Sequence, residues 1–383
     1  GLSRPSLPEI AGAERFAGKT FHTARWDHAY SLEGKRVAVI GTGASSIQVV
    51  PSIVDRVGKL TLFQRTPPWV LPKPDLKIGR RGQKRFADHP WMQRALRHTI
   101  YWLMESRALG FTNTIPSMQL SAEKRARDYL AEQIKDDALR AKLTPNYRIG
   151  CKRILISNDY YAALQRDNAE FVSDGIREIR EHSIVTNDGT EHVVDAIVYA
   201  TGFQAAESVS PFEIRGRDGR DLNQEWRDGA EAYLGVTING FPNLFMLTGP
   251  NTGLGHNSMV YMIESQLQYV MDGLRQMRER QLRWVDVKSA IQRAYNEKLQ
   301  TRLLKTVWAT GGCVSWYKTR RGKNTTLWPG FTFEYRYRTR QFDAHNYEQV
   351  RAVTEPARPI VPEGSADCLG RAAVLDRPSA QNP

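Results

Sequence analysis

Short apolar runs separated by polar turns indicate that the first half of the chain mixes strands and helices. Residues 36–40 (R-V-A-V-I) form an apolar run typical of a buried strand, and residues 59–64 (K-L-T-L-F-Q) form a second one. Between them, residues 44–57 carry apolar side chains at helical spacing. The order strand, helix, strand is typical of a parallel α/β unit.

The same α/β pattern continues further along the chain, interrupted by a long helical stretch. Four prolines between positions 67 and 74 end the regular structure that follows the second strand. Residues 82–143 are rich in Arg, Ala, Leu and Glu, and their helical spacing predicts a helical insertion. The other expected elements are strands at 171–172, 183–185, 193–200 and 241–247, a hairpin turn at 187–189 and a long helix at 258–280.

The two ends of the chain differ from this pattern. Residues 1–30 are punctuated by prolines and glycines and predict a connector, whereas the residues beyond about 340 lose periodicity and predict a loose tail. We therefore expect four segments. They are a connector at 1–30, a first α/β domain at 31–202 with its insertion at 82–143, a second unit at 203–345, and a tail at 346–383.

Composition is that of an ordinary globular enzyme with an excess of positive charge. Apolar residues make up 41% of the 383 residues and charged residues 25%, which is enough apolar content for two packed domains. The net charge of +13 raises the possibility of nucleic-acid binding. The basic residues are scattered and mixed with acids, as in residues 123–128, so an anionic cofactor and a solvated surface explain the excess better.

The cysteines and the longest apolar run indicate in which cellular compartment the protein is expected. Cys151, Cys313 and Cys368 cannot all pair within one chain and show no C-x-x-C spacing, so we expect no disulfide framework and a reducing, cytoplasmic location. The longest apolar stretch, near residues 100–115, is interrupted by charges, so no transmembrane helix is expected. No secretory leader is visible, and the dispersed histidines predict no metal site.

A glycine turn between the first strand and the first helix is the main candidate binding site. Gly41 permits a tight turn, and Gly43 lets the backbone approach a dinucleotide pyrophosphate. The helix N-terminus near Ala44 supplies N–H donors and a positive dipole, and Ser46 is small enough for the helix-packing position. The alternative is an ordinary strand-to-helix turn. The candidate pyrophosphate site is Gly41, Thr42, Gly43, Ala44, Ser45 and Ser46.

The end of the second strand predicts which dinucleotide binds. NAD-binding folds place an acidic residue there to hold the ribose hydroxyls, but this chain has Arg65 followed by Thr66. A guanidinium binds a 2′-phosphate through paired charge-assisted hydrogen bonds, whereas a carboxylate would repel it. The sequence therefore favours NADP(H), the alternative being that Arg65 is a solvated strand end.

Further motifs extend the pattern into a family resemblance. Residues 16–27 (F-A-G-K-T-F-H-T-A-R-W-D) match the fingerprint F-x-G-x-x-x-H-x-x-x-W-(P/D), with Phe16, Gly18, His22, Trp26 and Asp27 at its fixed positions. The segments F-Q-R-T-P, G-C-K-R, Y-A-T-G-F, F-P-N-L-F and S-W-Y follow in family order up to residue 317. The chain thus resembles the class B flavin-dependent monooxygenases, and within them the Baeyer–Villiger branch.

The resemblance implies roles for residues at matching positions. Arg65 and Thr66 match the pair that contacts the adenosine phosphate of NADP, and Lys152 matches a second contact to that phosphate. Arg153 matches the catalytic arginine that stabilises the C4a-peroxyflavin anion and the tetrahedral intermediate. An always-charged planar donor suits that role.

The remaining implied positions are nearer the flavin. Thr201 and Gly202 match the segment that returns the chain to the flavin domain, and Asn251 belongs to the loop beside the flavin ring. Trp316 matches a contact to the nicotinamide end of NADP, with a buried core aromatic as the alternative. His256 either reaches the ligand or is a solvated loop histidine, and His22 counts as a fingerprint residue and not as a proton donor.

The fold implied by the resemblance has two Rossmann-like nucleotide-binding domains. We expect the NADP domain to be complete, with its helical insertion, and the FAD domain to be represented only by its C-terminal half. The reason is that no flavin G-x-G-x-x-G turn precedes the fingerprint. For the same reason, we expect the chain expressed alone to bind FAD weakly or not at all.

The expected activity follows from the same resemblance. It is NADPH- and O2-dependent oxygen insertion next to a ketone carbonyl, with FAD as the second cofactor. The alternatives are oxygenation of nitrogen or sulfur atoms, or nucleotide binding without catalysis. The substrate, a small ketone or heteroatom compound, and the oligomeric state are not specified by the sequence.

Overall fold

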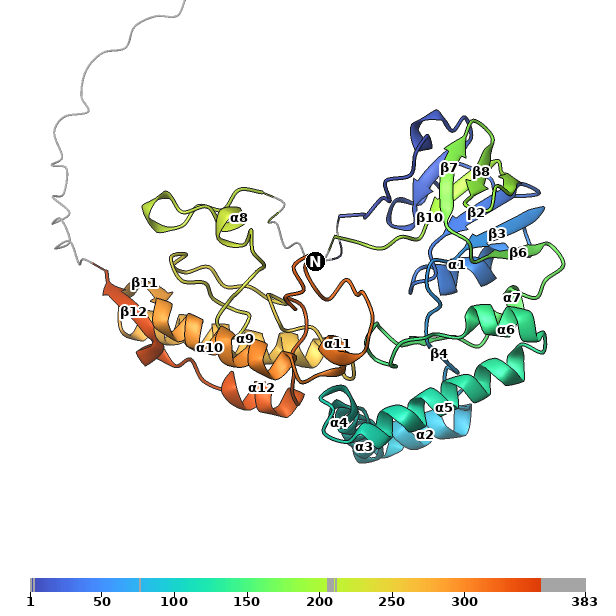
Figure 1. Cartoon of the computed structure of the whole chain (residues 1–383). Coiled ribbons are helices and arrows are strands. Elements are labelled where there is room, and N and C mark those ends of the chain that lie inside the picture. Colours follow the sequence, from blue (N-terminus) through green and yellow to red (C-terminus); the bar gives the residue numbers. More distant parts are fainter. Residues whose placement is uncertain (1, 3, 76, 205–209, 211, 353–383) are drawn as a thin grey trace, which may run out of the picture.

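The first half of the molecule is built on a five-stranded parallel sheet. The structure is a computed structural model that describes residues 2, 4–75, 77–204, 210 and 212–352. The strands of the sheet lie in the order β1-β10-β2-β3-β6, and every neighbouring pair is parallel (Figure 1). Their bounds are β1 Lys19–His22, β2 Arg36–Ile40, β3 Lys59–Phe63, β6 Ala169–Val172 and β10 Ala196–Tyr199.

The alternation of side chains along β2 gives the sheet two buried faces. Val37 and Val39 pack on one side, in a core shared with helix α1 (Ser46–Ile53) and helix α7 (Tyr160–Ala163). Ala38 and Ile40 pack on the other side, against a three-stranded antiparallel sheet. The strands of that second sheet are β7 Ile176–Arg180, β8 Ser183–Thr186 and β9 Glu191–Val193.

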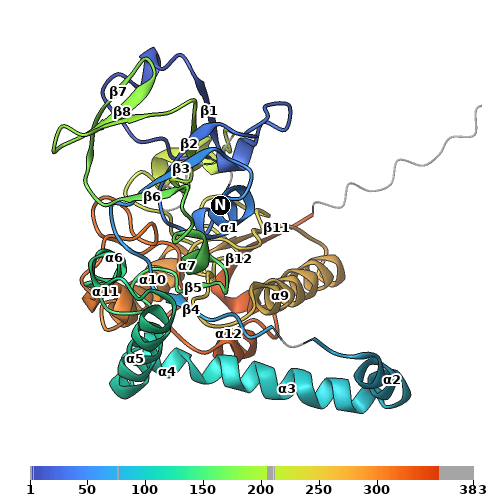
Figure 2. The same cartoon turned by 90° about the vertical axis from the view of Figure 1, so that its right-hand side faces the viewer.

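The insertion between β4 (Val70–Leu71) and β5 (Leu155–Ile156) is helical, as predicted for residues 82–143. Strands β4 and β5 pair in parallel and so bring the two ends of the insertion together. Figure 2 shows helix α3 running along the lower edge of the molecule with α2 at its far end. The helices are α2 Arg80–Asp88, α3 Pro90–Ser106, α4 Ala108–Phe111, α5 Pro116–Gln133 and α6 Asp137–Leu143.

The C-terminal part packs two long helices beside a two-stranded antiparallel sheet. Tyr269 and Met277 of α9 lie in one core with Val285 of β11 and Tyr347 of β12. None of the helices among the described residues is both long and apolar enough to cross a membrane. The elements of this part are α8 Leu222–Glu225, α9 Met259–Glu279, β11 Leu282–Val287, α10 Ser289–Leu303, α11 Val307–Thr310, α12 Thr332–Arg338 and β12 Tyr347–Arg351.

Most elements expected from the sequence are present, with shifted ends. The predicted α/β class, the first strand–helix–strand unit, the hairpin turn at 187–189 and the long helix near 258–280 are confirmed. The helix predicted at 44–57 begins only at Ser46, because the glycine turn occupies the residues before it. The strand predicted at 193–200 is divided between β9 and β10 at Asp195, whose carboxylate accepts a 2.8 Å hydrogen bond from the Arg36 N–H.

Two of the predicted segments differ in the structure. Residues 241–247 form no strand, because Asn243 has a φ of 59° and its N–H donates to the Val285 carbonyl outside any ladder. Residues 346–352 are not a loose tail, because β12 pairs with β11 there, whereas 353–383 lie outside the described residues. The connector at 1–30 contains β1, an edge strand of the parallel sheet. The proposed domain boundaries stay predictions.

Candidate functional site

The glycine turn lies where β2 meets α1, at the carboxyl edge of the parallel sheet. Gly41 has a φ of 108°, and a Cβ there would lie 2.6 Å from the Ala200 carbonyl oxygen. Only glycine fits this turn without strain. A Cβ on Gly43, in contrast, would meet no described protein atom within 4 Å. The space beside Gly43 is therefore open, as the approach of a pyrophosphate requires.

The turn is hydrogen-bonded to the segment after β3, which carries Arg65 and Thr66, the residues predicted to select NADP(H). The Thr42 hydroxyl donates a 3.0 Å hydrogen bond to the Thr66 carbonyl. The fully buried Ser46 hydroxyl has no hydrogen-bond partner among the described residues. A buried polar atom without a partner is costly, and because this hydroxyl is enclosed it is suited to a buried water molecule and not to a ligand. The open space beside Gly43 is the feature that fits a dinucleotide phosphate.

Arg65 and Lys152 lie close together although they come from different loops. Burial lowers the pKa of the Lys152 ammonium group, and the nearby positive charge of Arg65 lowers it further. The Lys152 Nζ also lies 5.0 Å from the centre of the Tyr147 ring. Arg65 is exposed and forms no salt bridge among the described residues. Two like charges held together without a carboxylate are suited to a phosphate.

Arg153 follows Lys152 and lies beside the S-W-Y segment. Burial raises the pKa of the Tyr317 phenol to about 12, and the charge of Arg153 acts in the opposite direction. Tyr317 in turn contacts Trp316, with ring centres 4.5 Å apart. Trp316 is 39% exposed and so retains surface for a ligand. The structure thus brings Arg65, Lys152, Arg153 and Trp316 into one region.

Cys151 and Cys313 form a disulfide, contrary to the expectation from the sequence. Their Cα atoms are 6.1 Å apart, and the bond joins positions 162 residues apart in the chain. Such a pairing depends on how the C-terminal part folds back, and the spacing of three cysteines does not reveal it. The bond connects the loop of Lys152 and Arg153 with the loop of Trp316.

The fingerprint residues are mainly packing residues beneath the turn. A Cβ on Gly18 would lie 2.4 Å from the Asp195 carbonyl oxygen, and the rings of Phe21 and Trp26 touch at 4.9 Å. Asp27 pairs with Lys19 at 2.6 Å. Phe16 packs against the core between the two sheets of the first half. These contacts fix the edge strand β1 beside β10.

His22 lies at the point where the chain leaves the parallel sheet. Its Nδ1 accepts a 3.1 Å hydrogen bond from the Ala24 N–H, and its ring contacts Phe203 at 5.5 Å. Burial lowers the pKa of His22, while a contact with the Gly202 backbone raises it. Thr201 next to it donates to the Ser6 carbonyl. His22 therefore packs against the segment at 201–203, and its place in the fingerprint stays a prediction.

Asn251 and His256 are buried in the C-terminal part. The Asn251 amide donates to the carbonyls of Asn324 and Leu327 at 2.8 and 3.1 Å, so its nitrogen holds a backbone segment. Its Oδ1 and both ring nitrogens of His256 have no partner among the described residues. The predicted contact of Asn251 with a cofactor stays a prediction. The alternative of a solvated His256 is wrong, because the side chain is buried.

The sequence analysis missed Glu105, a buried carboxylate that joins the helical insertion to the C-terminal part. Its carboxylate accepts a hydrogen bond from the Thr332 hydroxyl at 2.8 Å and lies 3.8 Å from His256 Nε2. Tyr317, Tyr147 and the two cysteines were also missed as neighbours of the basic residues. The only signals were their places in S-W-Y and G-C-K-R, since no periodicity distinguishes them.

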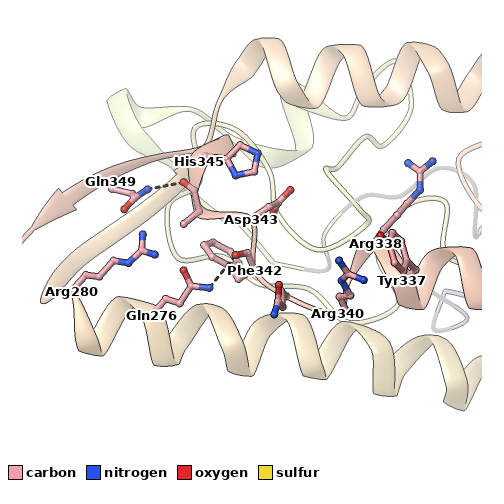
Figure 3. A pocket seen from close by; sticks show the side chains of 11 residues that line it. Gln276, Arg280, Tyr337, Arg338, Arg340, Phe342, Asp343, His345 and Gln349 are labelled. Atoms are coloured by element: carbon pink, nitrogen blue, oxygen red, sulfur yellow. Dashed lines mark hydrogen bonds between the residues drawn. The ribbon is translucent and has the colours of Figure 1, made fainter.

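A separate hollow of about 730 Å³ lies between the end of α9 and the segment leading into β12 (Figure 3). Arg280, Arg338, Arg340 and His345 are among its lining residues, and no residue of the candidate site is. Among the described residues, no group of three or more His, Cys, Asp or Glu side chains is placed to hold a metal ion. Because it shares no lining residue with the candidate site, the hollow is separate from the glycine turn and from Arg65, Lys152 and Arg153.

The fold is that of an α/β protein with a glycine turn between a strand and a helix, and comparison with known proteins identifies its family. Residues 2–212 match a family described as flavin-binding monooxygenase-like. A Baeyer–Villiger monooxygenase of Pseudomonas aeruginosa is 53% identical over 91% of this chain and 66% of its own length. One of Streptomyces coelicolor is 47% identical over 91% and 67%. The chain belongs to the flavin-binding monooxygenase-like family.

Solved structures show the same fold. A closed crystal structure of cyclohexanone monooxygenase is similar with a TM-score of 0.78 and 26% identity, over 92% of this chain and 73% of that one. Oxidised steroid monooxygenase bound to NADP is similar with a TM-score of 0.76 and 29% identity, over 92% and 74%. The chain spans about two thirds of the length of the first two curated relatives above.

Proposed function

We propose that this chain provides the NADP(H) site and the catalytic arginine of a flavin-dependent monooxygenase that converts ketones into esters or lactones. The observation that carries the proposal is the meeting of Arg65 and Lys152, two cations with no carboxylate partner among the described residues, near the turn that Thr42 joins to Thr66. Relatives at 53% and 47% identity carry the name Baeyer–Villiger monooxygenase. FAD, when bound, supplies the redox chemistry that activates O2.

Each residue of the site has a definite part in this proposal. The backbone from Gly41 to Ser46 holds the pyrophosphate, and Arg65, Thr66 and Lys152 hold the 2′-phosphate. Trp316 packs against the nicotinamide end. Arg153 donates hydrogen bonds where negative charge develops on oxygen, which lowers the barrier of that step. The protein also keeps water away from the reacting atoms.

We propose that residues 203–345 are the C-terminal part of an FAD-binding domain and that 31–202 are the NADP-binding domain. Helix α9 supports this division. Val260, Leu267, Met271 and Leu274 are exposed and recur at helical spacing along α9, so they form an apolar face. An apolar face of this kind favours contact with further protein. The fold match covers 73% of cyclohexanone monooxygenase, which leaves room for such a segment.

Product analysis tests the proposal. The protein is incubated with FAD, NADPH and O2 and with either a cyclic ketone or a thioether. Formation of the lactone is the expected result. Sulfoxide without lactone would instead support oxygenation of sulfur or nitrogen, the second candidate function. Tight NADP+ binding without any product or bound FAD would support a nucleotide-binding role alone.

We further propose a cytoplasmic location, because a reducing compartment suits a protein with few cysteines. Disulfides in that compartment, where they occur, are usually transient and respond to redox conditions.

A further inference from the structure

Two loops that carry site residues are linked by one covalent bond. The first, residues 148–153, contains Lys152 and Arg153, and the second, residues 311–317, contains Trp316. The Cys151–Cys313 disulfide joins them, and the Arg148 N–H donates a 3.0 Å hydrogen bond to the Gly311 carbonyl. These two connections determine where Trp316 lies relative to the basic residues.

The packing on the two sides of the bond differs. Cys151 is fully buried, and a Cβ on Gly311 would lie only 2.6 Å from its Cβ, so this side is tightly packed. Cys313 is partly exposed, and Val314 next to it is 87% exposed. A small thiol can therefore reach the Cys313 sulfur, whereas Cys151 is shielded.

Few other contacts hold the second loop after Gly311. Tyr317 is buried and anchors the end of the loop. The hydrogen bonds described for residues 312–316 are local: the N–H groups of Tyr317 and Lys318 donate to Ser315. Gly312 has a φ of 73°, a conformation that glycine adopts freely and that does not restrain the loop when the bond is broken. Breaking the disulfide thus leaves residues 312–316 without a covalent link to the first loop, held by their two ends, by the buried Ser315 and by the packing of the Cys313 side chain against the core.

We propose that Cys151 and Cys313 are a reversible thiol–disulfide pair that controls the nucleotide site. The oxidised pair holds Trp316 beside Lys152 and Arg153 and so preorganises the site for NADP(H). The reduced pair releases residues 312–316, which must then be ordered when the nucleotide binds. The inference rests on the proposed function, because it assumes that these loops bind NADP(H).

The exchange reaction balances with a low-molecular-weight disulfide as the oxidant. The Cys313 thiolate attacks one sulfur of that disulfide, forming a mixed disulfide and releasing one small thiolate. The Cys151 thiolate then attacks the Cys313 sulfur and releases the second small thiolate. The two cysteine protons end on the two released thiols, and the two electrons pass from the cysteines to the small disulfide. Excess small thiol drives the reverse reaction.

The test measures NADP+ affinity of the whole chain after equilibration with oxidised glutathione or with a phosphine reductant. Alkylation and mass spectrometry count the free thiols in each sample. The oxidised protein is expected to bind NADP+ about tenfold more tightly than the reduced protein, because its loop is already ordered. Hydrogen exchange of residues 311–317 is expected to be slower in the oxidised protein.

Two variants sharpen the test. Cys313→Ser is expected to bind NADP+ like the reduced protein and to ignore the redox treatment. Cys368→Ser, which removes the cysteine outside the described residues, is the matched control and keeps the full response. The redox comparison on the unsubstituted protein does not depend on either variant folding well.

The possible outcomes distinguish a failure of the redox inference from a failure of the proposed function. Equal NADP+ affinities in the two redox states, with the thiol counts confirming both, overturn the inference and leave the proposed function intact. Absence of NADP+ binding in both states overturns the proposed function and, with it, the control of that site. Redox-dependent hydrogen exchange without a change in affinity shows that the loop moves without controlling the nucleotide, and it too overturns the inference.

Discussion

Burial lowers the pKa of the Lys152 ammonium group, and the positive charge of Arg65 lies close enough to lower it further. Like charges repel, and burial of Lys152 adds to the cost of holding both in place. The arrangement is therefore unfavourable without a ligand and becomes favourable when an anion binds between the two groups. A 2′-phosphate is the anion that distinguishes NADP from NAD.

Replacing Arg65 with Ala is expected to weaken NADP+ binding by about 10- to 100-fold, which corresponds to the loss of charge-assisted hydrogen bonds. NAD+, which lacks the 2′-phosphate, should be affected little. Isothermal titration with both nucleotides measures the change. Arg94→Ala, on the exposed part of α3, is the control and should bind both nucleotides normally. Equal losses for NADP+ and NAD+ would contradict the assignment of Arg65 to the phosphate.

Alanine substitution is expected to have opposite effects at the two glycines of the turn, on stability at Gly41 and on nucleotide binding at Gly43. Gly41→Ala should lower the free energy of unfolding by about 1–3 kcal/mol, because its φ is 108° and its Cβ would collide with Ala200. Gly43→Ala should leave the thermal midpoint unchanged, because no described atom lies within 4 Å of its Cβ. The same change should reduce NADP+ affinity at least about tenfold by filling the space of the pyrophosphate. Normal binding by the folded Gly43→Ala variant would place the nucleotide elsewhere.

The glycine turn between β2 and α1 was predictable because it depends on local features. The apolar run at 36–40, the spacing of Gly41 and Gly43 and the basic residue at 65 all follow from short-range rules of strand, turn and helix. The structure adds that the carbonyl of Ala200, the residue after β10, requires glycine at position 41. Ala200 is distant from Gly41 in the sequence.

The contacts between distant segments were not predictable. The Cys151–Cys313 bond and the buried Glu105 depend on how the helical insertion and the C-terminal part fold against each other. The missed strand β12 has only Tyr347 buried and four exposed residues, so it lacks the apolar run that marks a strand. The false strand at 241–247 was apolar enough, but Asn243 turns the backbone there.

Arg153 is expected to act in catalysis and not in folding. Arg153→Ala should lower the turnover of ketone about 100- to 1000-fold, the usual cost of removing a donor to a developing oxyanion. The thermal midpoint should change little, because the side chain is exposed. Steady-state product formation and NADP+ titration together make the measurement. If NADP+ affinity falls as far as turnover does, Arg153 is a nucleotide-binding residue instead. Arg153→Lys, which keeps the charge without the planar fork, should be intermediate.

Stability is expected to fall in mild acid because His256 is buried. Burial lowers the pKa of His256 from its ordinary value of 6.5, and Arg107 lowers it further, whereas Glu105 raises it. Below pH 6.5 the unfolded histidine takes up a proton and the folded one does not, so the unfolded state binds more protons. The free energy of unfolding should therefore decrease as the pH falls from 6.5 towards the lower pKa of the folded state. Urea unfolding at several pH values measures this slope.

His256→Leu removes the titrating group and should flatten the slope over this pH range. The flattening should be partial, because burial lowers the pKa of His22 as well. An apolar replacement is reasonable, since neither ring nitrogen of His256 has a hydrogen-bond partner among the described residues and Glu105 lies 3.8 Å from Nε2. His98→Asn, on the exposed face of α3, is the matched control and should keep the original slope. An unchanged slope in His256→Leu would mean that the acid sensitivity arises elsewhere, at His22 or in the carboxylates.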